Sequence, residues 1–155
     1  MTMADAIAVM NQGRVEQLGT PTELYERPRT AYVAGFLGTS NLLAGNVEGA
    51  GAVRLEDGTL VRVATDGRTG RVAVGVRPEK VRLGEGGANV LAGTVRETAY
   101  VGVATQVIVD TPAGDVAVFH QNADAGTTVP DLGAPITVSW SPEATFVVDP
   151  EEAAP

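Results

Sequence analysis

From residue 41 onward, short runs of apolar residues alternate with polar positions, and turn-forming glycines and prolines separate the runs. This pattern predicts strands rather than helices. Asp57-Gly58 stands between two apolar runs and is typical of a tight hairpin, and the segment 111–114 indicates a looser one. The predicted strands are 42–48, 52–56, 60–64, 71–76, 80–83, 89–98, 105–110, 115–120, 136–140 and 145–148. Regularly spaced short strands of this kind favour a sandwich or a small barrel.

The first 40 residues follow a different pattern. Apolar runs at 7–10 and 14–18 flank a glycine-containing turn, which predicts a hairpin. A helix should begin after Thr20, because Glu23 stands three residues later and completes a capping box. That helix should end just before Pro28, because a proline disfavours helix in the residue that precedes it.

A second short helix is predicted over residues 31–37, with Gly38 as its C-terminal stop. Its apolar face should consist of Tyr32, Val33, Phe36 and Leu37. Two short helices and a hairpin bury little surface by themselves, so we expect an exposed apolar surface here and a homodimer, with exchanged N-terminal segments as one route to it. The residues expected to be exposed are Ile7, Val9, Val15, Tyr32, Val33 and Phe36.

An internal repeat accompanies the predicted strands. The pattern Leu-Ala-Gly-x-Val occurs at 43–47 and again at 91–95, and Val-x-Val-x-Pro-Glu at 74–79 recurs as Val-x-Trp-x-Pro-Glu at 138–143. The second pair is further apart than the first, which predicts an insertion in the second copy around residues 123–130. Two matches in the same order indicate a duplicated β-unit.

Composition excludes several classes of function. The formal net charge is −8, whereas a nucleic-acid binder needs a basic track that neutralises phosphates, so we expect no nucleic-acid partner. No apolar run is long enough to span a bilayer and no signal-peptide pattern is visible, so we expect no direct insertion into a membrane. Cysteine is absent, which excludes disulfides and fits a reducing cytoplasm.

The scarcity of reactive side chains also limits the chemistry. His120 is the single histidine and Lys80 the single lysine. A zinc site would have to rest on one histidine and carboxylates, and a Ser/His/Asp arrangement could use His120 alone, so neither is favoured. A phosphate-binding glycine loop needs a Gly-Lys-Ser/Thr ending, and Lys80 has no such neighbours. We therefore expect no catalytic, cofactor-binding or metal-binding residues in this chain.

Five segments resemble one family. Residues 3–28 resemble the end of the nucleotide-binding domain of ATP-binding-cassette (ABC) importer ATPases, and residues 36–43 resemble the junction that follows it. Gly-Val-Arg-Pro-Glu at 75–79 resembles the recurrent motif of the accessory domain in that family, the transport-associated OB-like (TOBE) domain. Segments 100–102 and 121–122 resemble the variant of polyamine-type importers.

The resemblance implies a mostly β fold: a small OB-like or MOP-like barrel built from the duplicated unit, preceded by a hairpin and two short helices. Its implied division is a remnant of the nucleotide-binding domain with linker helices over 1–40, the TOBE domain over 41–150 and a frayed tail over 151–155. The implied role is that of a regulatory and dimerising domain of the transport ATPase. The chain itself would not be an enzyme.

The resemblance also implies partners and location. The full-length family binds ATP and Mg²⁺, contacts permease subunits through the domain that this chain lacks, and lies in the cytoplasm at the inner face of the cell membrane. None of the family's ATP-binding motifs occurs in the 155 residues.

Four positions are candidates for an interface or a motif: Arg77, Pro78, Glu79 and Trp140. Arg77 and Glu79 could form an interface ion pair or contact a regulator, but a solvated strand end with a proline stop is the favoured interpretation. Trp140 takes the repeat position of Val76, which favours packing over a stacking platform. For His120, a satisfied strand end is favoured over a pH sensor.

A rival hypothesis is a free-standing barrel that binds a small ligand such as an oxyanion. Such a site needs converging backbone amides, hydroxyls or lysines. The single lysine and the excess of acidic residues weigh against it.

Overall fold

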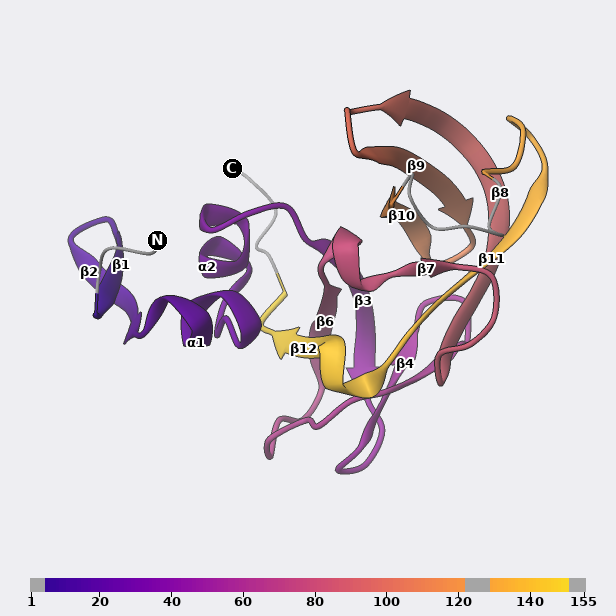
Figure 1. Ribbon diagram of the computed structural model, residues 1–155. Coiled ribbons are helices and arrows are strands. Elements are labelled where there is room, and N and C mark those ends of the chain that lie inside the picture. Colours follow the sequence, from indigo (N-terminus) through magenta and orange to yellow (C-terminus); the bar gives the residue numbers. More distant parts are fainter. Residues whose placement is uncertain (1–4, 122–128, 151–155) are drawn as a thin grey trace.

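The structure, a computed structural model, describes residues 5–121 and 129–150. Within these residues, a hairpin and two short helices lie beside a barrel of two five-stranded sheets (Figure 1). The N-terminal elements are β1 (Ile7–Asn11), β2 (Arg14–Gly19), α1 (Pro21–Glu26) and α2 (Ala31–Phe36). The predicted hairpin and both predicted helices are therefore confirmed, and α1 begins with the expected capping box between Thr20 and Glu23.

The two sheets of the barrel are antiparallel throughout. The first has the order β12-β6-β3-β4-β5 and the second β10-β9-β8-β11-β7. The strands of the first are β3 (Asn41–Val47), β4 (Ala52–Leu55), β5 (Leu60–Arg62), β6 (Arg71–Val76) and β12 (Thr145–Val148). Those of the second are β7 (Arg82–Leu83), β8 (Asn89–Tyr100), β9 (Ala104–Thr111), β10 (Gly114–Gln121) and β11 (Pro135–Trp140). The mostly β barrel predicted from the sequence is confirmed.

The sheet orders show how the duplicated unit is used. The first copy (residues 41–83) supplies β3 to β6, and the second copy (residues 89–148) supplies β8 to β11 in the equivalent order. Each copy then turns through a short 3-10 helix, η1 (Pro78–Lys80) or η2 (Pro142–Ala144), and gives its last strand to the other sheet. Thus β7 pairs with β11, and β12 pairs with β6.

Two repeated residues have the same structural task in both copies. A Cβ atom on Gly45 would lie 2.6 Å from the backbone oxygen of Arg54, and one on Gly93 would collide with the backbone oxygen of Asp110. Each glycine therefore allows the neighbouring strand to approach closely. The repeated Leu-Ala-Gly-x-Val pattern has this physical cause.

Paired asparagines close the barrel. The side-chain amide of Asn41 donates to the carbonyl of Ala117 (2.9 Å) and its oxygen accepts from the amide of the same residue (2.7 Å). Asn89 makes the same two bonds with the backbone of Arg62, at 3.0 and 2.7 Å. Each copy thus binds the edge strand of the other, which satisfies backbone groups that would otherwise be unpaired.

The main core lies between the two sheets and consists largely of valine. Trp140 is 1% exposed and is the largest fully buried side chain among the described residues, which confirms its predicted packing role. Strand β6, which lies between β12 and β3, is buried on both faces. Val74 faces the core, whereas Ala73 and Gly75 face outward and are covered by α2 and by Phe146 of β12.

The N-terminal elements differ from the prediction in which side chains they bury. Val9 and Val33 are 1% and 0% exposed, since they pack with Leu24 in a small cluster between the hairpin and the helices. The expectation that these two valines are exposed was therefore wrong. The predicted apolar face of α2 is confirmed for Val33 and Leu37, which pack in this cluster, and wrong for Tyr32 and Phe36, which are exposed. The contact with the sheet is made by Ala31 and Ala34, whose small size allows the helix to lie close to it.

Two further predictions meet the described structure differently. The predicted strand 80–83 is only two residues long, because Pro78 begins η1 and the chain is not extended until Arg82. The predicted insertion at 123–130 lies mostly outside the described residues, as does the tail 151–155. The division of the chain at residue 41 stays a prediction.

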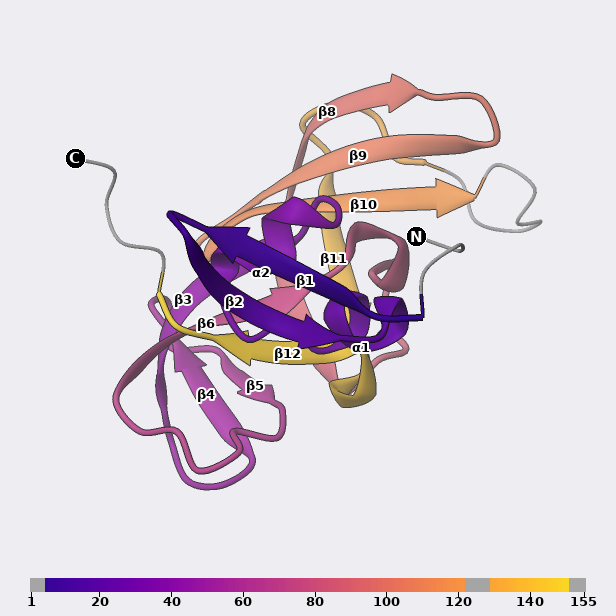
Figure 2. The same cartoon turned by 90° about the vertical axis from the view of Figure 1, so that its left-hand side faces the viewer.

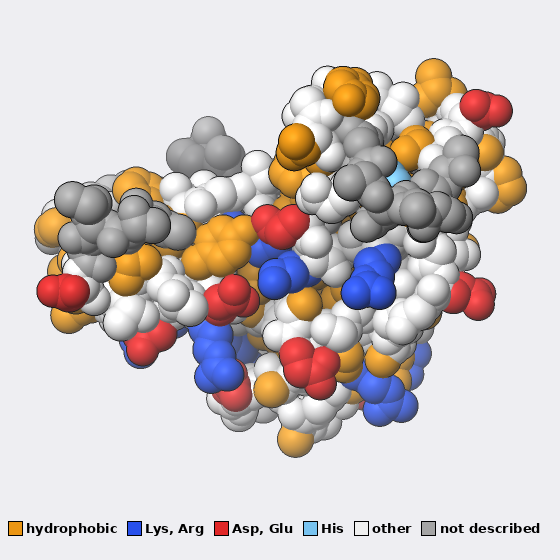
Figure 3. Space-filling view, viewed as in Figure 1, with side chains coloured by type: hydrophobic (Ala, Val, Ile, Leu, Met, Phe, Trp, Pro, Cys, Tyr) orange, Lys and Arg blue, Asp and Glu red, His pale blue; other side chains and the backbone are white. Residues whose placement is uncertain are grey.

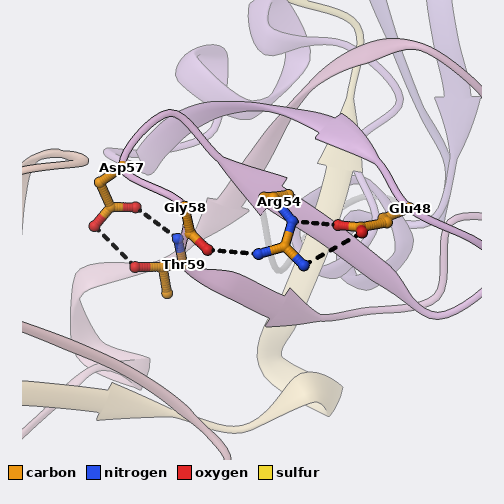
Figure 4. A network of polar contacts seen from close by, with 5 residues as sticks. All are labelled: Glu48, Arg54, Asp57, Gly58 and Thr59. Carbon is orange, nitrogen blue, oxygen red and sulfur yellow. Dashed lines mark hydrogen bonds and ion pairs between the residues drawn. The ribbon is translucent and has the colours of Figure 1, made fainter.

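The β4–β5 hairpin is fixed by a polar network (Figure 4). The guanidinium of Arg54 forms an ion pair with Glu48 at 2.5 Å and donates to the carbonyl of Gly58 at 2.8 Å. Asp57 accepts from both the amide and the hydroxyl of Thr59. The predicted Asp57-Gly58 turn is confirmed, with Gly58 at a φ of 93°.

Candidate functional site

Arg77 lies at the junction between the barrel and the N-terminal elements. It follows β6 directly and precedes Pro78, which begins η1 and is also buried. Only 3% of Arg77 is exposed. The interpretation of this residue as a solvated strand end was therefore wrong: the short apolar strand ends at the helices rather than in water.

The guanidinium of Arg77 binds backbone carbonyls from three segments. Its Nη1 donates to Ala34 of α2 at 2.8 Å and to Gly38 and Thr39 of the linker at 3.0 and 3.3 Å. Its Nη2 donates to the carbonyl of Tyr25 in α1 at 3.1 Å. Carbonyls in the last turn of a helix lack partners within the helix and carry partial negative charge. One cation thus satisfies the ends of both helices.

Two aromatic rings flank this guanidinium. Its Cζ lies 4.2 Å from the ring centroid of Tyr25 and 5.8 Å from that of Phe146. Burial lowers the pKa of Arg77, while the nearby Tyr25 and Glu79 act in the opposite direction. Arginine stays charged under such conditions. The interaction with the ring faces therefore adds to the hydrogen bonds in holding α1 against β12.

Glu79 extends the junction toward the surface. It is exposed, as the favoured interpretation had it, and its Oε2 accepts a hydrogen bond from the hydroxyl of Tyr25 at 2.7 Å. Burial, and then this bond to Glu79, raise the pKa of Tyr25 to about 12. Among the described residues no ion pair joins Arg77 to Glu79. Instead both contact Tyr25, a residue that the sequence pattern gave no reason to select.

The second copy lacks this junction. Its residue at the position of Arg77 is Ser141, which is exposed, and its Glu143 is exposed like Glu79. The Pro-Glu turn is therefore part of the barrel in both copies, whereas the arginine acts only where the helices are attached.

A groove of about 970 Å³ runs along this junction between α1 and β12. Its charged lining combines Glu23, Glu26, Asp66 and Glu143 with Arg27, Arg29 and Arg68. Arg68 also forms an ion pair with Asp149 at 2.5 Å and donates to the carbonyl of Arg29. The groove thus carries charges of both signs, which suits contacts between protein segments and does not point to one ligand.

The described residues contain no cluster of histidine, cysteine and carboxylate side chains that could hold a metal ion. His120 lies near the end of β10 and is 9% exposed, so it belongs to the barrel wall. No helix among these residues is long and apolar enough to cross a membrane.

A second surface feature lies on the hairpin and α2. We call it the hairpin surface; Figure 3 shows hydrophobic side chains gathered at this end of the molecule. Its exposed members are Met10, Val15, Leu18, Tyr32 and Phe36, with exposed fractions of 42 to 67%. The expected exposure of Val15, Tyr32 and Phe36 is thereby confirmed.

The family follows from residues 74–148, which include Arg77 and the whole second copy and which match the model of the TOBE domain. The chain carries a TOBE domain. Nearly its full length is also similar to ATP-binding subunits of importers. The spermidine/putrescine import ATP-binding protein PotA of Thermobifida fusca is 43% identical over 96% of this chain, and that of Acidothermus cellulolyticus is 43% identical over all of it.

The match covers only part of those relatives: 41% of the first and 45% of the second. The chain thus spans about two fifths of the length of the curated relatives it matches. A less similar relative is the uncharacterised ABC transporter ATP-binding protein YdcT of Escherichia coli, 35% identical over 91% of this chain and 38% of its own.

The fold has a solved counterpart. The cytoplasmic molybdate-binding protein ModG, in a molybdate-bound crystal form, superposes with a TM-score of 0.61 over 71% of this chain and 96% of its own. The sequences are 18% identical, so this likeness concerns the fold alone.

Proposed function

We propose that this chain is the regulatory and dimerising part of an ABC importer ATP-binding subunit for polyamines or related solutes. The observation that carries the proposal is the similarity to the PotA proteins, which extends over nearly all of the chain and includes both the barrel and the N-terminal elements. In this role the chain performs no chemistry. ATP and Mg²⁺ would be bound by a nucleotide-binding domain outside these residues.

The junction suits this role. Arg77 ties the ends of both helices to the first sheet, so the barrel and the N-terminal elements should move as one body. If a nucleotide-binding domain held the hairpin and helices, its movement would then move the barrel by the same amount. The reverse also holds, because coupling between two sites is reciprocal.

The hairpin surface suits it as well. Apolar side chains such as Leu18 and Phe36, exposed at 67% and 61%, are ordinarily covered in a stable assembly. In this proposal a nucleotide-binding domain covers them, contacts the permease subunits and keeps the assembly in the cytoplasm at the membrane.

A chimera tests the proposal. The matching two fifths of the Thermobifida fusca relative would be replaced by this chain, and the hybrid reconstituted with its permease partners in vesicles. We expect polyamine uptake and ATP hydrolysis to be retained. A matched hybrid that ends before residue 41 should hydrolyse ATP without normal regulation or assembly. Loss of both activities in a folded first hybrid would contradict the proposal.

Calorimetry tests the absence of ATP chemistry. Titration of the isolated chain with Mg-ATP should give no binding heat, because the chain has no phosphate-binding loop. Affinity in the micromolar range would overturn this part of the proposal.

The likeness to ModG favours a second candidate, an oxyanion-binding barrel. Thermal unfolding with molybdate, sulfate or phosphate tests it, since a ligand that binds only the folded state raises the midpoint as its concentration increases. We expect no shift beyond that of chloride at equal ionic strength. A saturable shift with one oxyanion would favour the second candidate.

A further inference from the structure

The second copy extends beyond the barrel. Strand β8 has 12 residues, whereas its counterpart β3 has 7. Its pairing with β11 ends at Thr94, and its pairing with β9 continues to Tyr100. We call residues 96–105 the arm; Figure 2 shows this end of β8 and β9 extending beyond β11, with β10 alongside β9. Nothing in the first copy corresponds to the arm, so barrel closure does not require it.

The arm carries exposed apolar side chains and little charge. Tyr100, Val101 and Val103 are 75%, 53% and 80% exposed. No charged residue occurs from 98 to 109 in a chain whose net charge is −8. Large exposed apolar groups in a neutral segment are typical of an interaction surface rather than of a solvated loop.

The arm also has an open strand edge. On the side away from β9, the last described contacts of β8 join Val95 to Gly133 and Ala134. Beyond them, no described strand pairs with this edge of β8. A strand edge of this kind presents backbone donors and acceptors in a row, and the partner that satisfies them best is another strand.

We propose that two copies of this chain associate through their arms, with the open edge of β8 paired antiparallel to the same edge of the partner about a twofold axis. In an antiparallel pair, the same strand edge can pair with itself about a twofold axis. A second copy therefore supplies the backbone donors and acceptors that this edge lacks. Two chains of charge −8 repel each other across most of their surfaces, and the arm is where that repulsion is least. The inference rests on the proposed function, because it locates the dimer contact of that role.

Sedimentation equilibrium on the chain at concentrations up to about 1 mM tests the proposal. The variant Val101→Lys/Val103→Lys places two charges on the arm, and its matched control Val15→Lys/Leu18→Lys places two on the hairpin surface. We expect the arm variant to weaken dimerisation at least about tenfold, since a charge buried without a partner is costly in an interface. The control should dimerise as the parent chain does.

Cross-linking gives a second, geometric readout. Because the chain has no cysteine, Ala99→Cys and Val15→Cys each introduce a single thiol. Under mild oxidation, Ala99→Cys should form a disulfide-linked dimer in high yield, while Val15→Cys should stay largely monomeric. Circular dichroism and thermal unfolding establish that every variant is folded.

Three results would overturn the inference: a parent chain that stays monomeric, a dimer that only the hairpin-surface variant weakens, or cross-linking through Val15→Cys alone. The last two would indicate association through the N-terminal segments. The chimera separates this failure from failure of the proposed function, because uptake by the hybrid can be retained whichever surface two isolated chains use.

Discussion

The two copies of the β-unit share the features that close the barrel and differ in those that face outward. Both begin with an asparagine that binds the other copy's edge strand, both need a glycine where strands approach, and both have a Pro-Glu turn before their last strand. Only the first has a buried arginine directly before its Pro-Glu turn, and only the second has an arm.

This difference indicates which residues serve the fold and which serve assembly. Positions that recur in both copies are explained by packing and hydrogen bonding within the barrel. Arg77 and the arm have no counterpart, and each lies where the barrel meets something else: the helices in one case, solvent or a partner in the other. Substitutions at matched positions of the two copies test this division directly.

The largest effect is expected at Arg77. Replacement by Met leaves carbonyls such as those of Tyr25 and Ala34 without a donor, and should reduce the free energy of unfolding by about 3 kcal/mol or more. The matched variant Ser141→Ala should change it by less than about 0.5 kcal/mol. Urea denaturation measures both. Equal changes in the free energy of unfolding would mean that Arg77 stabilises the fold no more than an exposed residue does.

The repeated glycines should behave alike. Gly45→Ala and Gly93→Ala each drive a methyl group against a neighbouring strand, so each should cost about 2–3 kcal/mol. Gly51→Ala is the control, since a Cβ there meets nothing within 4 Å. Thermal unfolding would compare the three. A large effect in only one copy would show that the copies do not share this close approach.

The asparagines come next. Asn41→Ala and Asn89→Ala each remove two hydrogen bonds to an edge strand and should cost about 1–2 kcal/mol. The exposed Asn46 supplies the control, Asn46→Ala, with an expected effect near zero. Hydrogen exchange should also quicken at the amide of Ala117 in the first variant and of Arg62 in the second. Unchanged exchange at these amides would contradict the closing role.

The smallest effect is expected from Tyr25→Phe, which removes only the bond to Glu79. Because the folded pKa of Tyr25 is raised from 10 to about 12, its contribution is complete below pH 10 and is lost as the pH rises through 12. Solvent screening limits it to about 1 kcal/mol or less. Urea denaturation should therefore show that the parent chain is more stable than the variant below pH 10 and that this difference disappears between pH 10 and 12. If the difference in the free energy of unfolding between the parent chain and the variant does not change with pH, its cause is packing rather than the hydrogen bond to Glu79.

Much of the fold could be predicted from local patterns. The strands at 71–76 and 145–148, the capping box at Thr20 and the repeat all depend on residues close in sequence. The burial of Arg77 depends on carbonyls 38 to 52 positions away, which no local pattern reveals. A lone arginine beside a proline looks solvated until the helices are placed over it.

The equivalence of the two asparagines could have been predicted from the sequence. Asn41 and Asn89 are separated by the same 48 positions as the repeated glycines, so an extension of the repeat by two residues would have paired them. What the repeat could not predict is the exchange of β7 and β12 between sheets, because that depends on how two copies close on each other. The same limit applies to α2, where alanines rather than the larger apolar residues contact the sheet.

The central proposal is that Arg77 couples the barrel to a nucleotide-binding domain outside these residues. The most direct measurement is polyamine-stimulated ATP hydrolysis by the chimera in vesicles, compared between Arg77→Lys and Ser141→Ala. Lysine keeps the charge but lacks the fork that reaches carbonyls from three segments. We predict that stimulation falls with Arg77→Lys in a protein that remains folded and is unchanged with Ser141→Ala. Equal stimulation in both variants would contradict the claim.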